Sequence, residues 1–476
     1  MNDQNKMQQG NMIANKPRQK DMAPLSFDVR DRSFTSSSFS SPFLLVVIFG
    51  AVIILGAVLL MLPMSHHGDG INDPVIAFFT ATSAVTVTGL TVVETSSYWS
   101  IFGKCVILFL MFIGGLGFMA MAAFLMALLG QRISTAQKLL IRESLNTDKL
   151  GGIQRLSVLI VVSAIAIQIV GFVFLLVRFL FLYPFNEAVW QAVFHAVSAY
   201  NNAGIVIFPE VDGFKHHGGD FITLGIIMWL IFLGSISFWV IADLATKRTF
   251  TLYRLATKIT LVATIALILF STLLFMSSEF SNPNTIGNMN LLEKMGISVF
   301  ESISGRTAGF TTINYSQVNP ATHIFMSFMM FIGGATGSVS GGIKVATLFV
   351  IVLSVIALIK EKSHVTIFDR EIDPITIRQS YAVFVICLAF VFTSTLLLAL
   401  TNNHVSVKDL AFESFSAFGT VGLSTGITPE LNTIGKIIIM ATMFIGRIGP
   451  LVIGLRMIPV GQTDSYRYAN ETVTIG

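Results

Sequence analysis

The chain has 476 residues, of which 53% are hydrophobic and only 12% are charged, and its formal net charge is +4. A soluble domain carries about twice that share of charged residues, so the composition excludes an ordinary soluble protein and indicates one that lies in a lipid bilayer. The basic residues are scattered along the chain instead of forming one stripe, which argues against binding to nucleic acid.

The first forty or so residues and the segment that follows them differ sharply in composition. Residues 1–42 are polar and rich in Ser, Asn and Gln, so we expect a mostly disordered cytoplasmic tail. The first apolar run, Phe43–Leu62, is long enough to cross a bilayer. Next come a shorter apolar segment, Pro74–Val85, and a second long run, Ile101–Leu129. We therefore expect two membrane helices with a half-membrane helix between them in residues 43–130.

The same order of segments recurs three more times along the chain. Each later unit has a long apolar run, a short apolar segment and a second long run, in residues 156–245, 258–360 and 381–457. The short segments are Val189–Ala199, Leu291–Ile303 and Val405–Ala417. A cytoplasmic tail, residues 458–476, is expected to end the chain. The sequence thus predicts an all-α polytopic membrane protein of four fused repeats, with eight spans and four re-entrant pore helices.

The positions of Lys and Arg predict the orientation in the membrane. Most of them lie in the two tails and in three loops, at residues 130–155, 246–258 and 360–378. Cytoplasmic loops of membrane proteins carry an excess of Lys and Arg. We therefore expect a multi-pass protein of the plasma (inner) membrane, with both termini in the cytoplasm and the pore helices on the outer side.

A short phrase that ends in glycine follows each half-membrane helix, and its copies recur about every 110 residues. The four phrases are Thr86-Val87-Thr88-Gly89, Asn201-Asn202-Ala203-Gly204, Arg306-Thr307-Ala308-Gly309 and Gly419-Thr420-Val421-Gly422. A single phrase of this kind is usually a helix cap or a packing glycine. Four copies in register, each after a helix too short to span, indicate a shared role.

Irregular backbone survives at membrane depth only where it is buried in protein or lines water. A ring of backbone carbonyls can replace the hydration shell of an alkali cation. Glycine permits the unusual backbone angles that turn successive carbonyls toward one axis, and the pore helices would direct the negative ends of their dipoles toward it. We therefore expect the four phrases to form a selectivity filter around one central pore.

Two details of the pore helices bear on this filter. Ser304 precedes its glycine by five residues, whereas Ser83, Ser198 and Ser416 precede theirs by six. The filter is therefore not expected to be fourfold symmetric. Glu301 and Glu413 lie late in two pore helices. They either add a negative field outside the filter or accept hydrogen bonds from nearby donors, and the sequence leaves both hypotheses open.

The apolar run His323–Lys360 is too long for one straight span, and its centre is rich in Gly and Ser. Each glycine costs a helix about 1 kcal/mol relative to alanine, so we expect an intramembrane loop that acts as a gate below the filter. The alternative is a kinked, closely packed helix. The gate residues are Gly334, Thr336, Gly337, Ser338, Ser340, Gly341 and Lys344. Lys344 either anchors the loop or repels cations in the closed gate.

Arg447 lies inside the last apolar run. A charge at that depth costs a few kcal/mol and needs a partner. One hypothesis places Arg447 near the pore beneath the filter, where its charge limits ion occupancy. The other is a structural interaction with a pore-helix carboxylate or with helix-end carbonyls. A second arginine, Arg306, is in the third phrase, and its side chain is expected to point away from the axis.

The four phrases with their flanking residues resemble those of the Trk/Ktr/HKT superfamily of potassium transporters. The resemblance covers residues 43–476, and eight spans without an additional amino-terminal pair resemble the Ktr membrane subunits (the KtrB type) more than the larger Trk ones. It implies four fused potassium-channel-like units, potassium uptake, K⁺ bound at the filter carbonyls, and frequent stimulation by sodium ions. It also implies a homodimer regulated by a cytosolic ring of nucleotide-binding subunits of the KtrA type.

The chain itself contains neither a Walker A phrase nor a Gly-x-Gly-x-x-Gly phrase between a strand and a helix. We therefore expect no organic cofactor here and assign any nucleotide to the separate subunit. A coupled secondary transporter of a small solute is the alternative function. It would need carboxylates or paired charges near the midplane, and the expected spans hold almost none. No cluster of catalytic residues stands out, so we expect a transporter rather than an enzyme.

Overall fold

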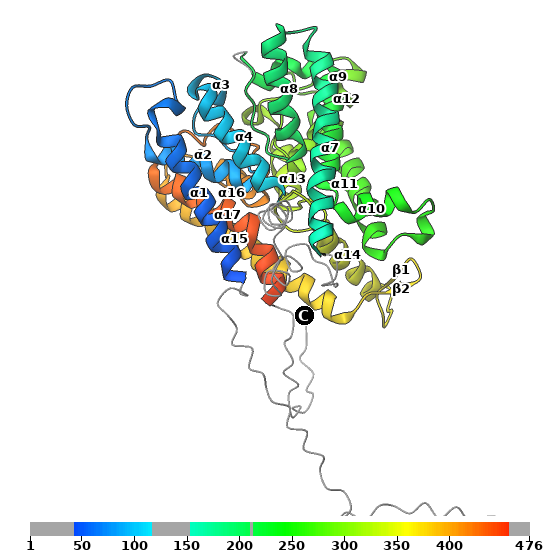
Figure 1. Ribbon diagram of the computed structural model, residues 1–476. Coiled ribbons are helices and arrows are strands. Elements are labelled where there is room, and N and C mark those ends of the chain that lie inside the picture. Colours follow the sequence, from blue (N-terminus) through cyan, green and yellow to red (C-terminus); the bar gives the residue numbers. More distant parts are fainter. Residues whose placement is uncertain (1–41, 117–152, 210–212, 457–476) are drawn as a thin grey trace, which may run out of the picture. The chain divides into compact units, whose positions relative to one another are not determined.

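The computed structural model describes residues 42–116, 153–209 and 213–456, and these residues are mostly helical (Figure 1). Three predicted features lie outside the described residues: the tail at 458–476, the tail at 1–42 except for its last residue, and the end of the second expected span. The only paired strands in the described part are the two-residue β1 (Thr366–Ile367) and β2 (Arg370–Glu371), which form an antiparallel hairpin. An all-helical architecture is confirmed.

The helices follow the order that the sequence predicts. The first repeat contains α1 (Pro42–Met61), α2 (Pro74–Thr86), the short α3 (Thr95–Tyr98) and α4 (Ile101–Leu116). The second contains α7 (Ile153–Phe179), α8 (Phe185–Tyr200), α9 (Phe221–Ser235) and α10 (Phe238–Thr246). The third contains α11 (Leu255–Glu279), α12 (Leu291–Thr307), α13 (Pro320–Phe331) and α14 (Val345–Ile359). The fourth contains α15 (Pro374–Thr401), α16 (Val407–Gly419) and α17 (Thr433–Arg456).

Local sequence signals explain where several of these helices begin. The carboxylate of Asp73 accepts a hydrogen bond from the Val75 amide at 2.8 Å, with Pro74 at the first helical position of α2. Asp373 and Pro374 start α15 in the same way. An acceptor at the N-cap satisfies amides that have no partner within the helix, and proline at the first position removes one such amide.

The span expected at Phe221–Ala245 is not one straight helix. It consists of α9 and α10, which are bent by 99° at Ile236 and Ser237. Four helices of the described part are long and apolar enough to cross a membrane by themselves, within α7, α11, α15 and α17, and the bent pair makes a fifth candidate. The shorter apolar helices include α1, α4 and α14. Eight separate straight spans are therefore not present among the described residues.

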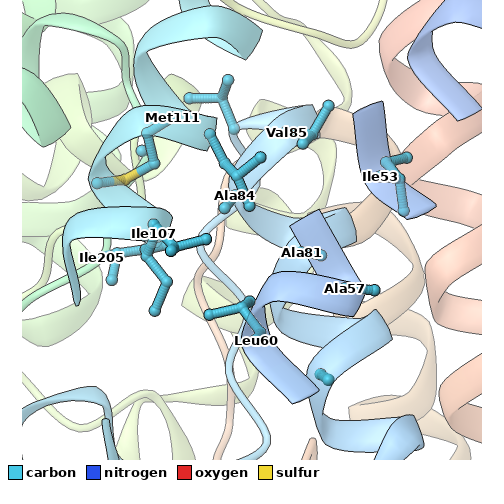
Figure 2. Packing of buried hydrophobic residues seen from close by; sticks show 14 of the residues in the cluster. Ile53, Ala57, Leu60, Ala81, Ala84, Val85, Ile107, Met111 and Ile205 are labelled. Carbon is cyan, nitrogen blue, oxygen red and sulfur yellow. The ribbon is translucent and has the colours of Figure 1, made fainter. Parts of the chain in front are cut away.

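Each pore helix lies between the two flanking helices of its own repeat. In the first repeat, α2 contacts both α1 and α4. Figure 2 shows Leu60 of α1, Ala84 of α2 and Ile107 of α4 in one buried cluster. Ile205, which directly follows the second glycine phrase, is part of the same cluster. The packing thus places the second phrase beside the first repeat.

The repeats contact one another in a closed order. The helix that follows one pore helix contacts the pore helix of the next repeat, in the pairs α4 with α8, α9 with α12, and α13 with α16. The series closes because α17 of the last repeat contacts α2 of the first. The four glycine phrases are therefore held at the centre of a cyclic arrangement of pore helices.

Candidate functional site

All four phrase glycines have backbone angles that side chains rarely permit. The φ angles of Gly89, Gly204, Gly309 and Gly422 are 88°, 63°, 74° and 93°. A Cβ atom is disfavoured in this left-handed region, and glycine is its usual occupant. The local conformation alone therefore accounts for a glycine at each of the four positions.

The surroundings of these glycines show how the four turns meet. A Cβ atom added to any of them would lie under 3.0 Å from a carbonyl oxygen of the next turn. The contacts run from Gly89 to Ala203, from Gly204 to Ala308, from Gly309 to Val421 and from Gly422 to Thr88. The last contact returns to the first turn, so the turns form a closed ring. At each junction between two turns (a seam), the glycine of one turn faces the carbonyl of the residue that precedes the glycine of the next.

A serine near the end of each pore helix fixes the following turn. The amides of Gly89 and Gly422 donate to the hydroxyls of Ser83 and Ser416, at 3.0 and 3.1 Å. In the other two turns the serine is the donor: Ser198 donates to the carbonyl of Ile205 at 2.8 Å. Ser304 does the same to Phe310 at 2.6 Å. The turns are thus held by equivalent serines in two different ways.

The third turn differs from the others, as the serine spacing predicts. Val87, Asn202 and Thr420 each stand two residues before the glycine and have positive φ angles of 57°, 55° and 49°. The corresponding residue of the third turn, Thr307, is still part of α12. The ring therefore departs from fourfold symmetry, because its third member lacks the left-handed residue.

The two pore-helix carboxylates accept hydrogen bonds from the segments that follow their turns. Glu301 is buried and accepts from the amide of Thr312 at 2.8 Å and from the hydroxyl of Tyr315 at 3.0 Å. Glu413 is buried and accepts from the hydroxyl of Ser424. These contacts favour the hypothesis that both carboxylates satisfy nearby donors, and they tie each pore helix to the chain beyond its turn.

The loop between α13 and α14, residues 332–344, is the predicted gate segment. Its two ends pair with each other, since the amide of Gly333 donates to the carbonyl of Ile343 at 2.8 Å. The ammonium group of Lys344 donates to the carbonyl of Ser340 at 2.6 Å. The chain is therefore broken between α13 and α14 and is not a kinked helix, and Lys344 anchors the loop in this conformation.

The loop also occupies the break between α9 and α10. The amide of Ala335 donates to the carbonyl of Ser235 at 3.0 Å, and that of Val339 donates to Gly234 at 3.2 Å. In a continuous α-helix these carbonyls would accept from the amides four residues later, at Phe238 and Trp239. The sequence alone did not predict this bend, because the loop amides that replace the helical partners come from a distant part of the chain. A local signal is Ser237, which caps α10 by accepting from Trp239.

The loop has two further contacts with the ring itself. The amide of Gly341 donates to the hydroxyl of Thr420 at 3.0 Å. The side chains of Asn202 and Ser340 are hydrogen-bonded at 3.0 Å. When the Asn202 amide is oriented to satisfy all its neighbours, its oxygen accepts from both Ser340 and Thr307. Sequence reasoning considered only the backbone of Asn202 and Thr420 and missed these side-chain contacts.

Arg447 of α17 interacts with backbone carbonyls. One of its terminal nitrogens donates to the carbonyl of Val339 in the loop, and the other donates to the carbonyl of Gly114 in α4 at 2.6 Å. In the described part of the chain it forms no ion pair with a carboxylate. These contacts favour a structural interaction with backbone carbonyls over one with a pore-helix carboxylate.

Arg306 and Asp243 are two further buried charged residues. Arg306 is 1% exposed in the last turn of α12; that its side chain points away from the axis stays a prediction. Asp243 forms an ion pair with Lys247 at 2.8 Å. Asp243 also accepts from the hydroxyl of Thr257 at 2.7 Å, which joins α10 to α11.

The chain is similar to known cation transport proteins. Residues 30–466 match the family model described as "TrkH: Cation transport protein". "Ktr system potassium uptake protein B" of Bacillus subtilis is 37% identical over 447 residues, covering 94% of this chain and 99% of that protein. The protein of the same description from Vibrio alginolyticus is 36% identical and covers 94% of this chain and 98% of its own length.

Two further matches bear on the ion and on the fold. "Potassium/sodium uptake protein NtpJ" of Enterococcus hirae is 32% identical and covers 90% of this chain and 95% of that protein. Among solved structures, the potassium transporter TrkH from Vibrio parahaemolyticus matches with a TM-score of 0.65. It covers 90% of this chain and 86% of its own, at 17% identity, so the likeness concerns the fold alone.

Proposed function

The chain belongs to the TrkH family of cation transport proteins, and we propose that it takes up potassium ions through the ring formed by its four glycine turns. The closed series of contacts between each glycine and a carbonyl of the next turn carries this proposal. Four carbonyl groups around one ring offer an alkali cation the oxygen ligands that it loses on leaving water. Four relatives named for potassium uptake, at 32 to 37% identity over most of the chain, support the choice of ion.

In this proposal the four phrases are the selectivity filter. Their backbone carbonyls bind K⁺, and the side chains are left free to hold the turns in place. The filter comprises Thr86–Gly89, Asn201–Gly204, Arg306–Gly309 and Gly419–Gly422. The pore helices α2, α8, α12 and α16 end directly before or within these phrases, so the negative ends of their dipoles favour a cation at the ring.

The loop at residues 332–344 is proposed as the gate. It is bonded at the same time to two filter turns, to the break between α9 and α10, and to Arg447. A segment held by so many separate contacts has a well-defined closed position, and it opens the path only when several contacts are released together. Gly334, Thr336, Gly337, Ser338, Ser340, Gly341 and Lys344 are its proposed functional residues.

The remaining features of the proposal concern regulation and assembly. We infer a multi-pass protein of the plasma membrane with cytoplasmic termini, which assembles as a homodimer and is regulated by a cytosolic nucleotide-binding ring of the KtrA type. The names of three relatives, as components of Ktr systems, support a multi-subunit assembly. The name of another relative includes sodium, which supports sodium as an activator or second cation.

The test is ion flux into liposomes that contain the purified chain. We expect uptake of potassium and rubidium to exceed uptake of sodium, since a carbonyl ring discriminates between these ions. Expression in cells that lack potassium uptake should restore growth at low potassium. If neither flux nor growth is seen, with or without a cytosolic partner, the proposed function is wrong.

A further inference from the structure

Two filter turns each have a side chain that contacts the gate loop. Thr420 and Asn202 occupy the same position in their turns, two residues before the glycine, and each is 1% exposed. The Thr420 hydroxyl accepts from the amide of Gly341 at 3.0 Å, and the Asn202 amide group is bonded to Ser340 at 3.0 Å. Both turns are thus connected to adjacent residues of one loop.

The order of the turns in the ring shows where these two contacts lie relative to each other. The seams join the first turn to the second, the second to the third, the third to the fourth and the fourth to the first. The second and fourth turns are therefore on opposite sides of the ring. Because Ser340 is bonded to one of them and Gly341 to the other, this part of the loop lies across the ring and not beside it.

The fit at Gly341 is close. A Cβ atom added to Gly341 would lie under 3.0 Å from the side chain of Thr420, so only glycine brings the loop amide to the hydroxyl without displacement. Thr420 itself has a positive φ of 49°, which is rare for a β-branched residue. Unfavourable backbone angles persist only where surrounding contacts impose them, and they occur often at functional sites.

Among the residues that the structure describes, no hydrogen bond joins the other two turns to the loop. Val87 has a positive φ like Thr420 but an apolar side chain. Thr307 is part of α12, and its hydroxyl faces the Asn202 amide group and not the loop. The second and fourth turns are therefore the pair equipped to hold the loop.

We propose that Asn202 and Thr420 are positioning residues that hold the gate loop in place from opposite sides of the ring. This inference rests on the proposed function of ring and loop. Their side chains stabilise the closed position of Ser340 and Gly341 across the axis, while their backbones remain part of the filter. Opening the gate requires that both contacts break, so the conformation of the two turns and the position of the loop are coupled.

The decisive variant is Thr420→Val, which removes the hydroxyl but keeps the size and β-branching of the side chain. Val87 shows that valine is compatible with this position of a turn. Loss of one hydrogen bond should raise the basal rubidium leak of purified protein in liposomes about fivefold. Thr420→Ser restores the hydroxyl and should return the leak to the original value.

Ser340→Ala breaks the contact on the opposite side and tests the same idea without any change in the filter. The double variant should leak more than either single one. Thr442→Val is the matched control, because the Thr442 hydroxyl is bonded to Ser394 of α15 and Ile438 of α17, neither of which belongs to the loop. We expect an unchanged leak for this control.

Different outcomes separate the inference from the function on which it rests. If the original protein conducts potassium but neither Thr420→Val nor Ser340→Ala raises the leak, the inferred role of Asn202 and Thr420 is wrong and the proposed function stands. A leak accompanied by lost selectivity in Thr420→Val would assign its side chain to the filter and also overturn the inference. Absence of potassium flux in the original protein contradicts the proposed function itself.

Discussion

At the residue scale, the ring glycines are constrained twice, by a positive φ and by a carbonyl oxygen of the neighbouring turn. Gly89→Ser introduces a side chain that meets Ala203, so the first and second turns must separate. We expect a lower ratio of potassium to sodium flux in liposomes, because the displaced carbonyls no longer match the ion. Gly225→Ala is a suitable control, since a Cβ there meets no atom within 4 Å. Unchanged selectivity in Gly89→Ser would remove this glycine from the filter.

The buried carboxylate of Glu301 permits a test of its two hypothetical roles. A glutamine can keep its oxygen toward the amide of Thr312 and direct its NH₂ group at the hydroxyl oxygen of Tyr315. Glu301→Gln should therefore retain most of the thermal stability and the potassium flux. Glu301→Leu leaves several buried donors without an acceptor and should lower the free energy of unfolding by about 2–3 kcal/mol. A strong loss of potassium flux in Glu301→Gln would instead favour the electrostatic role.

At the scale of single elements, Asp220 joins two helices near the end of α7. Its carboxylate caps α9 through the amides of Ile222 and Thr223, and it accepts from Arg178 of α7 at 2.9 Å. Burial alone would raise the pKa of Asp220, but hydrogen bonds from Thr223 and Arg178 outweigh it and hold the pKa below the usual 3.8. The stabilising contribution is thus complete above pH 3.8 and is lost as the pH falls through the lowered pKa.

This pH dependence is measurable in thermal unfolding between pH 7 and pH 3. Asp220→Asn keeps a side chain that caps helices well but removes the ionisable group. We expect this variant to be less stable than the original protein at pH 7, with a difference that shrinks at the acid end. An equal difference at every pH would contradict the assignment of the stabilisation to the ionised carboxylate.

The bend between α9 and α10 predicts how the chain tolerates proline. Phe238 is the first residue of α10, where proline fits because the amide needs no helical partner. Phe232 lies inside α9, where proline removes a helical hydrogen bond and clashes with the preceding turn. Phe232→Pro should therefore lower stability by about 3 kcal/mol, and Phe238→Pro should change it far less. Equal losses in thermal unfolding of the purified variants would show that the bend is not a stable feature.

The same elements show what the sequence can predict. The four glycine phrases, the pore helices before them and the break in the third repeat depend on local composition and on a repeated order, and the sequence predicts them. The bend at Ile236 and Ser237 depends on amides of Ala335 and Val339, about one hundred residues further along the chain, so an uninterrupted apolar run hides it. The side-chain contacts of Asn202 and Thr420 are equally distant in sequence, and repetition of the phrases directs attention to the backbone only.

At the scale of the whole described part, the four repeats are joined by a series of helix contacts that ends where it begins. Each pore helix contacts a helix of the preceding repeat, so every turn is positioned by two repeats. The break in α9–α10 and the loop after α13 then connect the second repeat to the third. Arg447 adds α17 and α4 to this connection. The proposed gate segment is consequently bonded to the second and fourth repeats and, through Arg447, connected to the first, although it belongs to the third.

The closed series of glycine seams has a consequence for genetic analysis. In a homotetramer every substitution appears four times, whereas here one codon alters a single quadrant of the ring. Pairs of substitutions can therefore measure energetic coupling around the circle. Adjacent positions such as Gly89 and Gly204 share a seam and should be non-additive by about 0.5–3 kcal/mol, while diagonal positions such as Gly89 and Gly309 should be nearly additive. Each quadrant can likewise differ in structure from the other three, as the third one does.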